Sequence, residues 1–86
     1  MASYSLEIKR SAAKELAQLP TKDRGRVIVC IQALAADPRP SGAEKLSGQE
    51  RYRVRQGDYR ILYEIEDQVL RVIVVKIGHR RDVYRA

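Results

Sequence analysis

Apolar and polar positions in the first half of the chain change from a period of two to the period of a helix. Residues 4–8 alternate between apolar and polar side chains, which predicts a short strand with one buried face. Apolar residues then recur three or four positions apart, which predicts a helix over residues 11–19 with Ser11 as its cap. A proline ends this helix, and a second helix is predicted with Thr21 as its cap and the helical period continuing to Asp37.

Arg51, Arg53 and Arg55 lie on one face of a predicted strand, because strand side chains repeat every two residues. Gly57 begins a two-residue turn of type II′, and the resulting hairpin register brings Arg60 to the face of Arg53 and Arg55. Like charges this close oppose folding unless a polyanion or carboxylates neutralise them, so the pattern indicates a binding face. The spacing alone also fits a solvated or partner-binding stripe.

Residues 70–77 are apolar on both faces, which predicts a central strand that is covered on both sides. The order of elements is then β-α-α-β-β-β. We predict an α+β fold, in which two helices cover one face of a small, mainly antiparallel twisted sheet and the other face is basic.

A two-residue turn at residues 67–68 is predicted to join the last two strands. It would set Glu64 opposite Arg71 and place Ile73 and Val75 on the face of the arginines. The basic face would then have an apolar floor.

The composition of the chain limits the classes of protein to which it can belong. With 86 residues and a net charge of +6, the chain is expected to form one domain, residues 1–86, that binds nucleic acid or an acidic protein. Its start has an acid at position 7 and no apolar segment, so no signal peptide or membrane partner is expected and we predict a cytoplasmic location. Cys30 is the only cysteine and His79 the only histidine, which excludes an internal disulfide and a Cys/His metal cluster. No metal or cofactor is predicted.

The arginine cluster, with Tyr84 near the end of the chain, suits a phosphodiester. Guanidinium groups bind phosphate in a bidentate manner and can stabilise the extra charge of a pentacovalent transition state. RNA supplies its own nucleophile, the 2′-hydroxyl, so such a site needs alignment, charge and two proton transfers. Tyr84 could stack on a base or pack on the sheet, and His79 is the one side chain that titrates near neutrality.

Residues 52–63 and 75–84 together closely resemble the RelE branch of the RelE/ParE toxin superfamily, and the resemblance extends over the whole chain. It implies the toxin of a type II toxin–antitoxin system: a small ribonuclease that cuts messenger RNA in the ribosomal A site and is silenced by an antitoxin encoded beside it.

The resemblance also implies roles for individual residues. The family's catalytic basic residues and its C-terminal tyrosine correspond to Arg53, Arg55, Arg60, Arg80 and Tyr84, and we assign substrate binding to Arg51 and Arg81. The best-known members carry lysines where this chain has the strand pair of arginines. Because arginine practically cannot lose its proton, the general base is unassigned, and His79 is a secondary candidate.

Two other functions share the fold. One is a ParE-like inhibitor of DNA gyrase, and the other is a basic binding module that represses its operator DNA only as a complex with the antitoxin. For the antitoxin we predict an acidic, amphipathic segment that orders on the basic face over Leu62, Ile73 and Val75.

Overall fold

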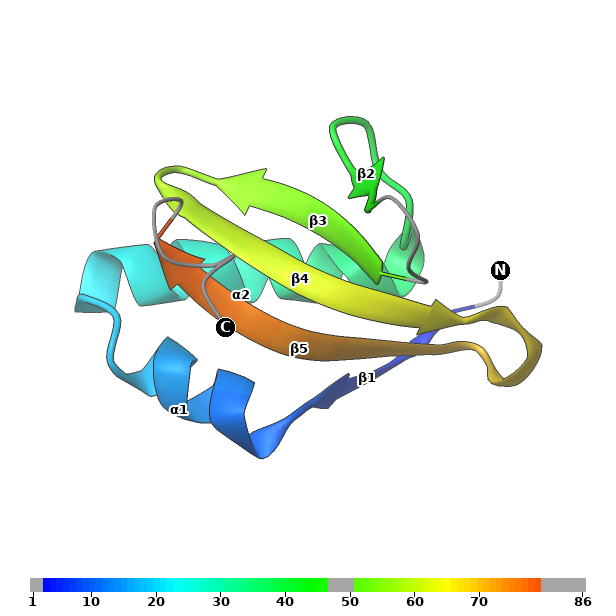
Figure 1. Cartoon of the computed structure of the whole chain (residues 1–86), viewed down its shortest axis with the longest axis horizontal. Coiled ribbons are helices and arrows are strands. Elements are labelled where there is room, and N and C mark those ends of the chain that lie inside the picture. The colour runs from blue at the N-terminus through cyan, green and yellow to red at the C-terminus, as the bar shows by residue number, and fades with distance from the viewer. Residues whose placement is uncertain (1–2, 47–50, 80–86) are drawn as a thin grey trace.

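The structure is a computed structural model that describes residues 3–46 and 51–79. The predicted fold class is confirmed: two helices pack on a five-stranded sheet of strand order β1-β5-β4-β3-β2, in which β1 runs parallel to β5 and the other pairs are antiparallel (Figure 1). In chain order the elements are β1 (Ser5–Ile8), α1 (Arg10–Ala17), α2 (Thr21–Ala36), β2 (Glu44–Lys45), β3 (Arg51–Gln56), β4 (Tyr59–Glu66), the 3₁₀ turn η1 (Asp67–Val69) and β5 (Arg71–His79). The short strand β2 is an addition to the predicted order β-α-α-β-β-β.

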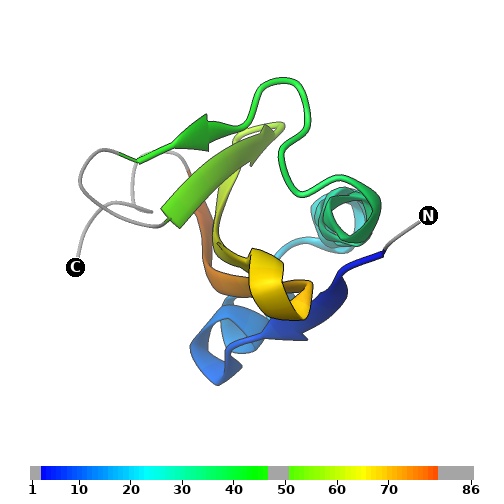
Figure 2. The same ribbon diagram turned by 90° about the vertical axis from the view of Figure 1, so that its right-hand side faces the viewer.

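The hydrophobic core lies between the two helices and one face of the sheet. In the end-on view α2 lies beside the twisted sheet (Figure 2). The largest side chains with almost no exposed surface come from α2 and from the two central strands: Val27, Leu34, Ile61, Tyr63, Val72, Val74 and Ile77. The central strand predicted over residues 70–77 is therefore confirmed as β5, although it extends to His79 rather than ending before Gly78.

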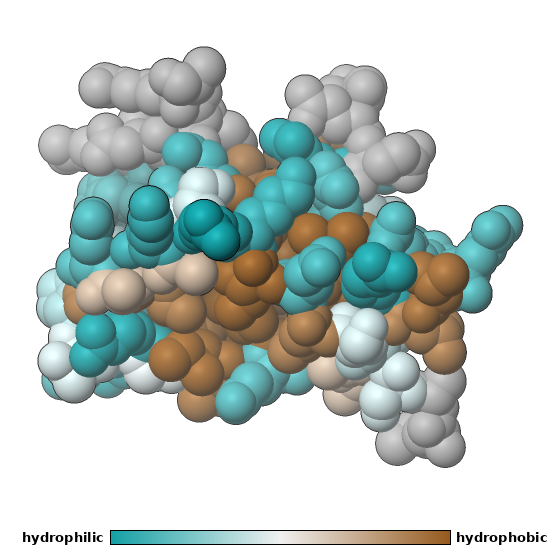
Figure 3. All heavy atoms as spheres, turned by 90° about the horizontal axis from the view of Figure 1, so that it is seen from below, coloured by the Kyte–Doolittle hydropathy of each residue, from teal (hydrophilic) through white to brown (hydrophobic). Residues whose placement is uncertain are grey.

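The first strand and the first helix differ in detail from the prediction. Leu6 and Ile8 keep 37% of their surface exposed, because β1 is an edge strand that the helices cover only in part. The view from below, toward β1 and α1, accordingly shows apolar surface between polar side chains (Figure 3). Helix α1 begins at Arg10 and ends at Ala17, and the residue before it, Lys9, makes no side-chain cap, so the predicted cap at Ser11 is wrong. The predicted cap at Thr21 is also wrong, because Thr21 is the first residue of α2 and Pro20 precedes it.

The β3–β4 hairpin has the predicted turn and register. Gly57 has a φ of 62° and Asp58 keeps a negative φ, which fits a type II′ turn. Gln56 pairs with Tyr59 beside the turn, and Arg55 then pairs with Arg60. The turn therefore fixes which side chains share a face along the whole hairpin.

The connection between β4 and β5 corrects the predicted register. Instead of a two-residue turn, η1 is followed by Leu70 in the left-handed region at a φ of 52°. The longer turn sets Glu66 opposite Arg71 and Glu64 opposite Ile73, so the predicted pairing of Glu64 with Arg71 is wrong. Arg71 still has a carboxylate partner, because its Nε lies 3.2 Å from an oxygen of Glu66.

A β-bulge between Leu62 and Tyr63 changes the alternation of β5. Val74 pairs with Tyr63 and Lys76 pairs with Leu62, so Val75 is the extra residue. Without the bulge, the alternation that places Ile73 and Val75 on the arginine side would continue to His79.

No helix in the part of the chain that the structure describes is long and apolar enough to cross a membrane.

Candidate functional site

Four arginines occupy the face of the β3–β4 hairpin that points away from the helices. We call this group, Arg51, Arg53, Arg55 and Arg60, the arginine face. Arg55 lies opposite Arg60, and Arg53 lies opposite Leu62. The sequence prediction that Arg53, Arg55 and Arg60 share a face is confirmed.

Carboxylates compensate part of this charge. The Arg51 Nε lies 3.1 Å from an oxygen of Glu64, and an Arg53 nitrogen forms an ion pair and hydrogen bond with Glu44 on β2. The sequence allowed for carboxylates but identified neither partner, because both pairs depend on strand register. In the unbound protein, therefore, these two arginines are not bare cations.

Arg55 and Arg60 differ in their surroundings. Arg55 is exposed and has no ion-pair or hydrogen-bond partner among the described residues, whereas Arg60 is half-buried and its Nε atom is shielded from solvent. An exposed guanidinium can rotate toward a ligand, while a partly buried one is held in place. The pair thus combines one exposed and one partly buried positive charge.

The predicted apolar floor of the arginine face is present. Leu62 and Val75 are buried and form a small cluster of their own, with Ile73 and Leu46 packed against it. The cluster is separate from the main core on the helix side. A surface with apolar side chains beside arginines can accept a polyanion or an amphipathic acidic segment.

His79 is not brought to the arginine face. It pairs with Tyr59, and the two rings meet edge to face with centroids 6.1 Å apart. Tyr59 packs against the main core on the helix side, and its hydroxyl is 3.4 Å from a carboxylate oxygen of Asp23 on α2. Partial burial, together with Asp23, raises the pKa of the Tyr59 hydroxyl. His79 lies on the opposite side of the sheet from Arg60 because the bulge in β5 reverses the side-chain alternation after Val75.

The candidates Arg80, Arg81 and Tyr84 lie outside the described residues. Within the described ranges there is no group of three or more His, Cys, Asp or Glu side chains that could hold a metal ion. Among these same residues the arginine face can bind an anion and stabilise developing negative charge, but it offers no histidine for proton transfer.

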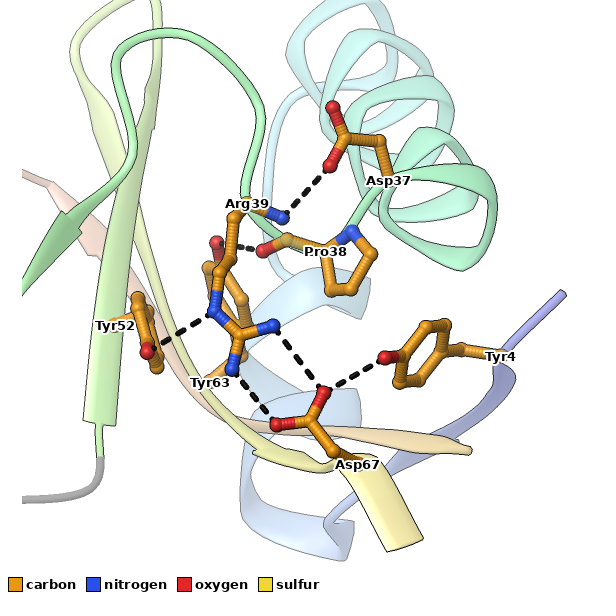
Figure 4. A network of polar contacts seen from close by, with 7 residues as sticks. All are labelled: Tyr4, Asp37, Pro38, Arg39, Tyr52, Tyr63 and Asp67. Carbon is orange, nitrogen blue, oxygen red and sulfur yellow. Dashed lines mark hydrogen bonds and ion pairs between the residues drawn. The ribbon is translucent and has the colours of Figure 1, made fainter. Parts of the chain in front are cut away.

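A polar network that the sequence did not reveal lies at the other end of the hairpin (Figure 4). Two guanidinium nitrogens of Arg39 donate to the two carboxylate oxygens of Asp67, at 3.2 and 2.9 Å. The Tyr4 hydroxyl donates to the same carboxylate at 2.7 Å, and the Arg39 Nε donates to the Tyr52 hydroxyl at 3.2 Å. The network joins residues that are up to 63 positions apart, so no local spacing could have found it.

The network changes the titration of its members. The hydrogen bonds from Arg39 and Tyr4 lower the pKa of Asp67 to about 2, and the bond to Asp67 raises the pKa of Tyr4. Burial raises the pKa of Tyr63 to about 12, and its hydroxyl donates to the Pro38 carbonyl at 2.7 Å. Asp67 is thus an exposed residue of the turn between β4 and β5 that is held by two partners, Arg39 and Tyr4. We interpret the network as structural, because it ties η1 and β1 to the segment after α2.

Cys30 is half-buried against the core, and burial raises the pKa of its thiol. A thiol with a raised pKa is a poor nucleophile. In this position Cys30 acts as a small apolar side chain of the core.

The fold and the arginine face define a small α+β protein with a basic sheet surface, and comparison with known proteins shows its family. The model of the family described as "ParE toxin of type II toxin-antitoxin system, parDE" matches residues 6–84. The chain belongs to this family. The resemblance to the RelE/ParE superfamily stated from the sequence is thereby confirmed.

Individual relatives agree with this assignment. The chain is 31% identical to toxin RelE of Mycobacterium tuberculosis, over 95% of this chain and 87% of that protein. It is 29% identical to toxin RelG of the same organism, over 95% of this chain and 97% of the relative.

Solved structures show the same fold. The RelBE2 toxin–antitoxin complex of M. tuberculosis contains a chain with a TM-score of 0.83 at 26% identity, covering 95% of this chain and 97% of that one. The archaeal RelE–RelB complex of Pyrococcus horikoshii contains a chain with a TM-score of 0.82 at 28% identity, covering 98% of this chain and 99% of that one.

Proposed function

We propose that this chain, acting as one toxin domain over residues 1–86, is a ribosome-dependent endoribonuclease that cleaves messenger RNA and thereby inhibits translation. The observation that carries the proposal is the opposition of Arg55 and Arg60 beside Arg53 on one face of the hairpin. Relatives named RelE and RelG support it.

The proposed reaction begins with attack of an RNA 2′-hydroxyl on the adjacent phosphate. A 2′,3′-cyclic phosphate forms, and the bond to the 5′-oxygen of the next nucleotide breaks. Arg53, Arg55 and Arg60 would hold the phosphate oxygens and stabilise the added charge of the transition state. One proton must leave the 2′-hydroxyl and another must reach the leaving oxygen. No metal is required by this route, because the substrate carries the nucleophile and the arginines supply the positive charge.

The remaining site residues extend this proposal to the end of the chain. Arg80 would add a further charge at the phosphate, and Tyr84 would stack on or orient a base. Arg51 and Arg81 would bind the flanking RNA backbone. His79 is kept as a secondary acid–base candidate, although its side of the sheet in the described structure does not favour it.

The proposed partner in the resting state is a cognate antitoxin. Solved relatives were crystallised as toxin–antitoxin complexes, and the floor of Leu62, Ile73 and Val75 beside the arginines suits an amphipathic acidic segment. In this proposal the toxin binds operator DNA only as part of that complex, and it acts on ribosomes in the cytoplasm.

The decisive experiment compares ribosome-bound and free RNA in a purified translation system. We expect the wild-type protein to cut message in the A site, and we expect Arg60→Ala to cut far more slowly while remaining folded by circular dichroism. An intact message after treatment with folded wild-type protein would reject the proposal.

A second function, inhibition of DNA gyrase, is favoured by the matching family model, which is described as a ParE toxin. It would use the surface as a binding face and need no RNA cleavage. Inhibition of gyrase supercoiling that survives Arg55→Gln and Arg60→Ala would support it.

A further inference from the structure

Gly25 lies in the interior of α2, where glycine weakens a helix relative to alanine. The usual reasons for such a glycine are absent within the described chain. Its φ is not positive, and a Cβ built at this position would meet no atom within 4 Å. The missing side chain therefore leaves open space on the surface rather than room for another part of this protein.

That space belongs to a groove of about 340 Å³ between α2 and the end of β3. Gly25, Arg26, Val29 and Gln56 line it. Val29 is the most exposed large apolar residue of the described structure, with 65% of its surface accessible. The exposed Val29 side chain and the bare backbone at Gly25 together offer a surface against which an apolar side chain of a partner can pack.

Part of the β3 edge beside this groove has no paired strand among the described residues. Strand β2 pairs only with Tyr52 and Arg53, so no described strand covers β3 from Val54 to Gln56 (Figure 1). Gln56 points to the helix side, and Arg55 points to the arginine face. A polypeptide that crosses this part of the edge can therefore touch the groove and the arginine face together.

The charge around the groove selects the kind of partner. Arg26 is exposed, and Lys22 lies one turn earlier on the same side of α2. Arg55 adds a third positive charge at the strand edge. Two copies of this basic groove would repel each other, whereas an acidic chain would be attracted. The apolar lining favours a protein side chain over an RNA backbone.

We propose that this groove is a second docking site for the antitoxin, in which an apolar side chain of an acidic segment packs against Gly25 and Val29 while its carboxylates pair with Arg26 and Lys22. Glycine at position 25 lets the backbone of that segment approach α2 closely. The proposal rests on the antitoxin partner of the proposed function, but it does not require that the toxin cleave RNA.

The test uses variants that leave the free toxin folded. Gln is a better helix former than Gly, so Gly25→Gln should raise the melting temperature of the free toxin. Its side chain would fill the groove, so the affinity for the antitoxin should fall by about tenfold or more. Val29→Asp should lower the affinity for the antitoxin by a similar factor, because the substitution places a carboxylate against an acidic partner. Ile28→Ala is the matched control, since Ile28 is a partly exposed β-branched residue of the same helix outside the groove. Its affinity should stay within about twofold of wild type.

Affinity would be measured by calorimetry with the polypeptide encoded in the neighbouring reading frame. Wild-type affinity in both Gly25→Gln and Val29→Asp overturns the proposal, as does failure of that polypeptide to bind the wild-type toxin. Loss of ribosomal cleavage in Gly25→Gln with unchanged antitoxin affinity also overturns it, because the groove would then serve RNA. A wild-type toxin that binds the antitoxin without cutting RNA rejects the proposed nuclease, while weakened binding by the groove variants still supports the docking site.

Discussion

Arg55 and Arg60 lie directly opposite each other across the β3–β4 hairpin. The two-residue turn makes Gln56 and Tyr59 the hydrogen-bonded pair, so the arginines form the next, non-hydrogen-bonded pair, in which strands bring side chains closest. Like charges at such a pair destabilise a sheet. An anion bound between them would remove that repulsion, which links the stability of the hairpin to ligand binding.

Replacing the exposed member of this pair should separate stability from activity. In Arg55→Gln we expect the free energy of unfolding to rise by up to about 0.5 kcal/mol, because the cross-strand repulsion is lost. Cleavage of ribosome-bound RNA should fall about 10- to 100-fold, because a charge at the phosphate is lost. Urea unfolding and a cleavage time course measure the two effects. Arg10→Gln, an exposed arginine of α1, is the control and should change neither. Unchanged cleavage in Arg55→Gln would show that this arginine does not serve the reaction.

Glu44 is expected to compete with RNA for Arg53. The Glu44 side chain is 65% exposed while that of Arg53 is 14% exposed, so breaking their ion pair should change the free energy of unfolding by less than about 1 kcal/mol. Glu44→Gln removes a carboxylate that competes with a phosphate for the Arg53 guanidinium. We expect tighter binding of single-stranded RNA and a slope of log affinity against log salt that is steeper by about 0.7. A slope equal to that of the wild type would mean that Arg53 does not contact phosphate.

The Arg39–Asp67 network predicts loss of stability in acid. Asp67 has a folded pKa of about 2, below its ordinary value of 3.8, so its contribution is complete above pH 4 and is lost as the pH falls toward 2. The free energy of unfolding of the wild type should therefore fall over this range more than that of Asp67→Asn. Urea titrations from pH 5 to about pH 2 measure the difference. Parallel curves for the two proteins would show that the network does not shift the titration of Asp67.

Tyr63→Phe should destabilise the protein without affecting its activity. The Tyr63 ring is fully buried and its hydroxyl donates to the buried Pro38 carbonyl, so removing the hydroxyl leaves that oxygen without its partner. We expect a loss of about 1–2 kcal/mol. Tyr4→Phe is a matched control that removes a hydrogen bond at an exposed carboxylate, and it should cost less. Thermal unfolding measures the loss of stability in both variants. Equal losses in Tyr63→Phe and Tyr4→Phe would contradict the prediction.

Gly25→Ala should stabilise the free toxin by about 0.5–1 kcal/mol, because alanine favours the helix and its methyl group meets open space. Urea unfolding in the absence of antitoxin measures this gain. Destabilisation would show that the glycine serves the fold itself, which would remove the first argument for a docking groove at this position.

The sequence by itself determined the features that depend on local spacing. The strand alternation around Val54 and the Gly57 turn fixed the hairpin register, and therefore the shared face of Arg53, Arg55 and Arg60. The helical period from Thr21 onward fixed α2 and its buried side. These predictions succeeded because each follows from the geometry of a few consecutive residues.

Tertiary structure alone decided the features that join distant segments. The bulge opposite Leu62 turned His79 away from the arginine face, and a longer turn at Asp67 moved the partner of Arg71 from Glu64 to Glu66. Likewise, Arg39 met Asp67, and Glu44 met Arg53, only because the sheet brings them together. One inserted residue reverses every later side chain of a strand, and an ion pair between distant segments leaves no periodic trace in the sequence. Both depend on how the whole chain packs.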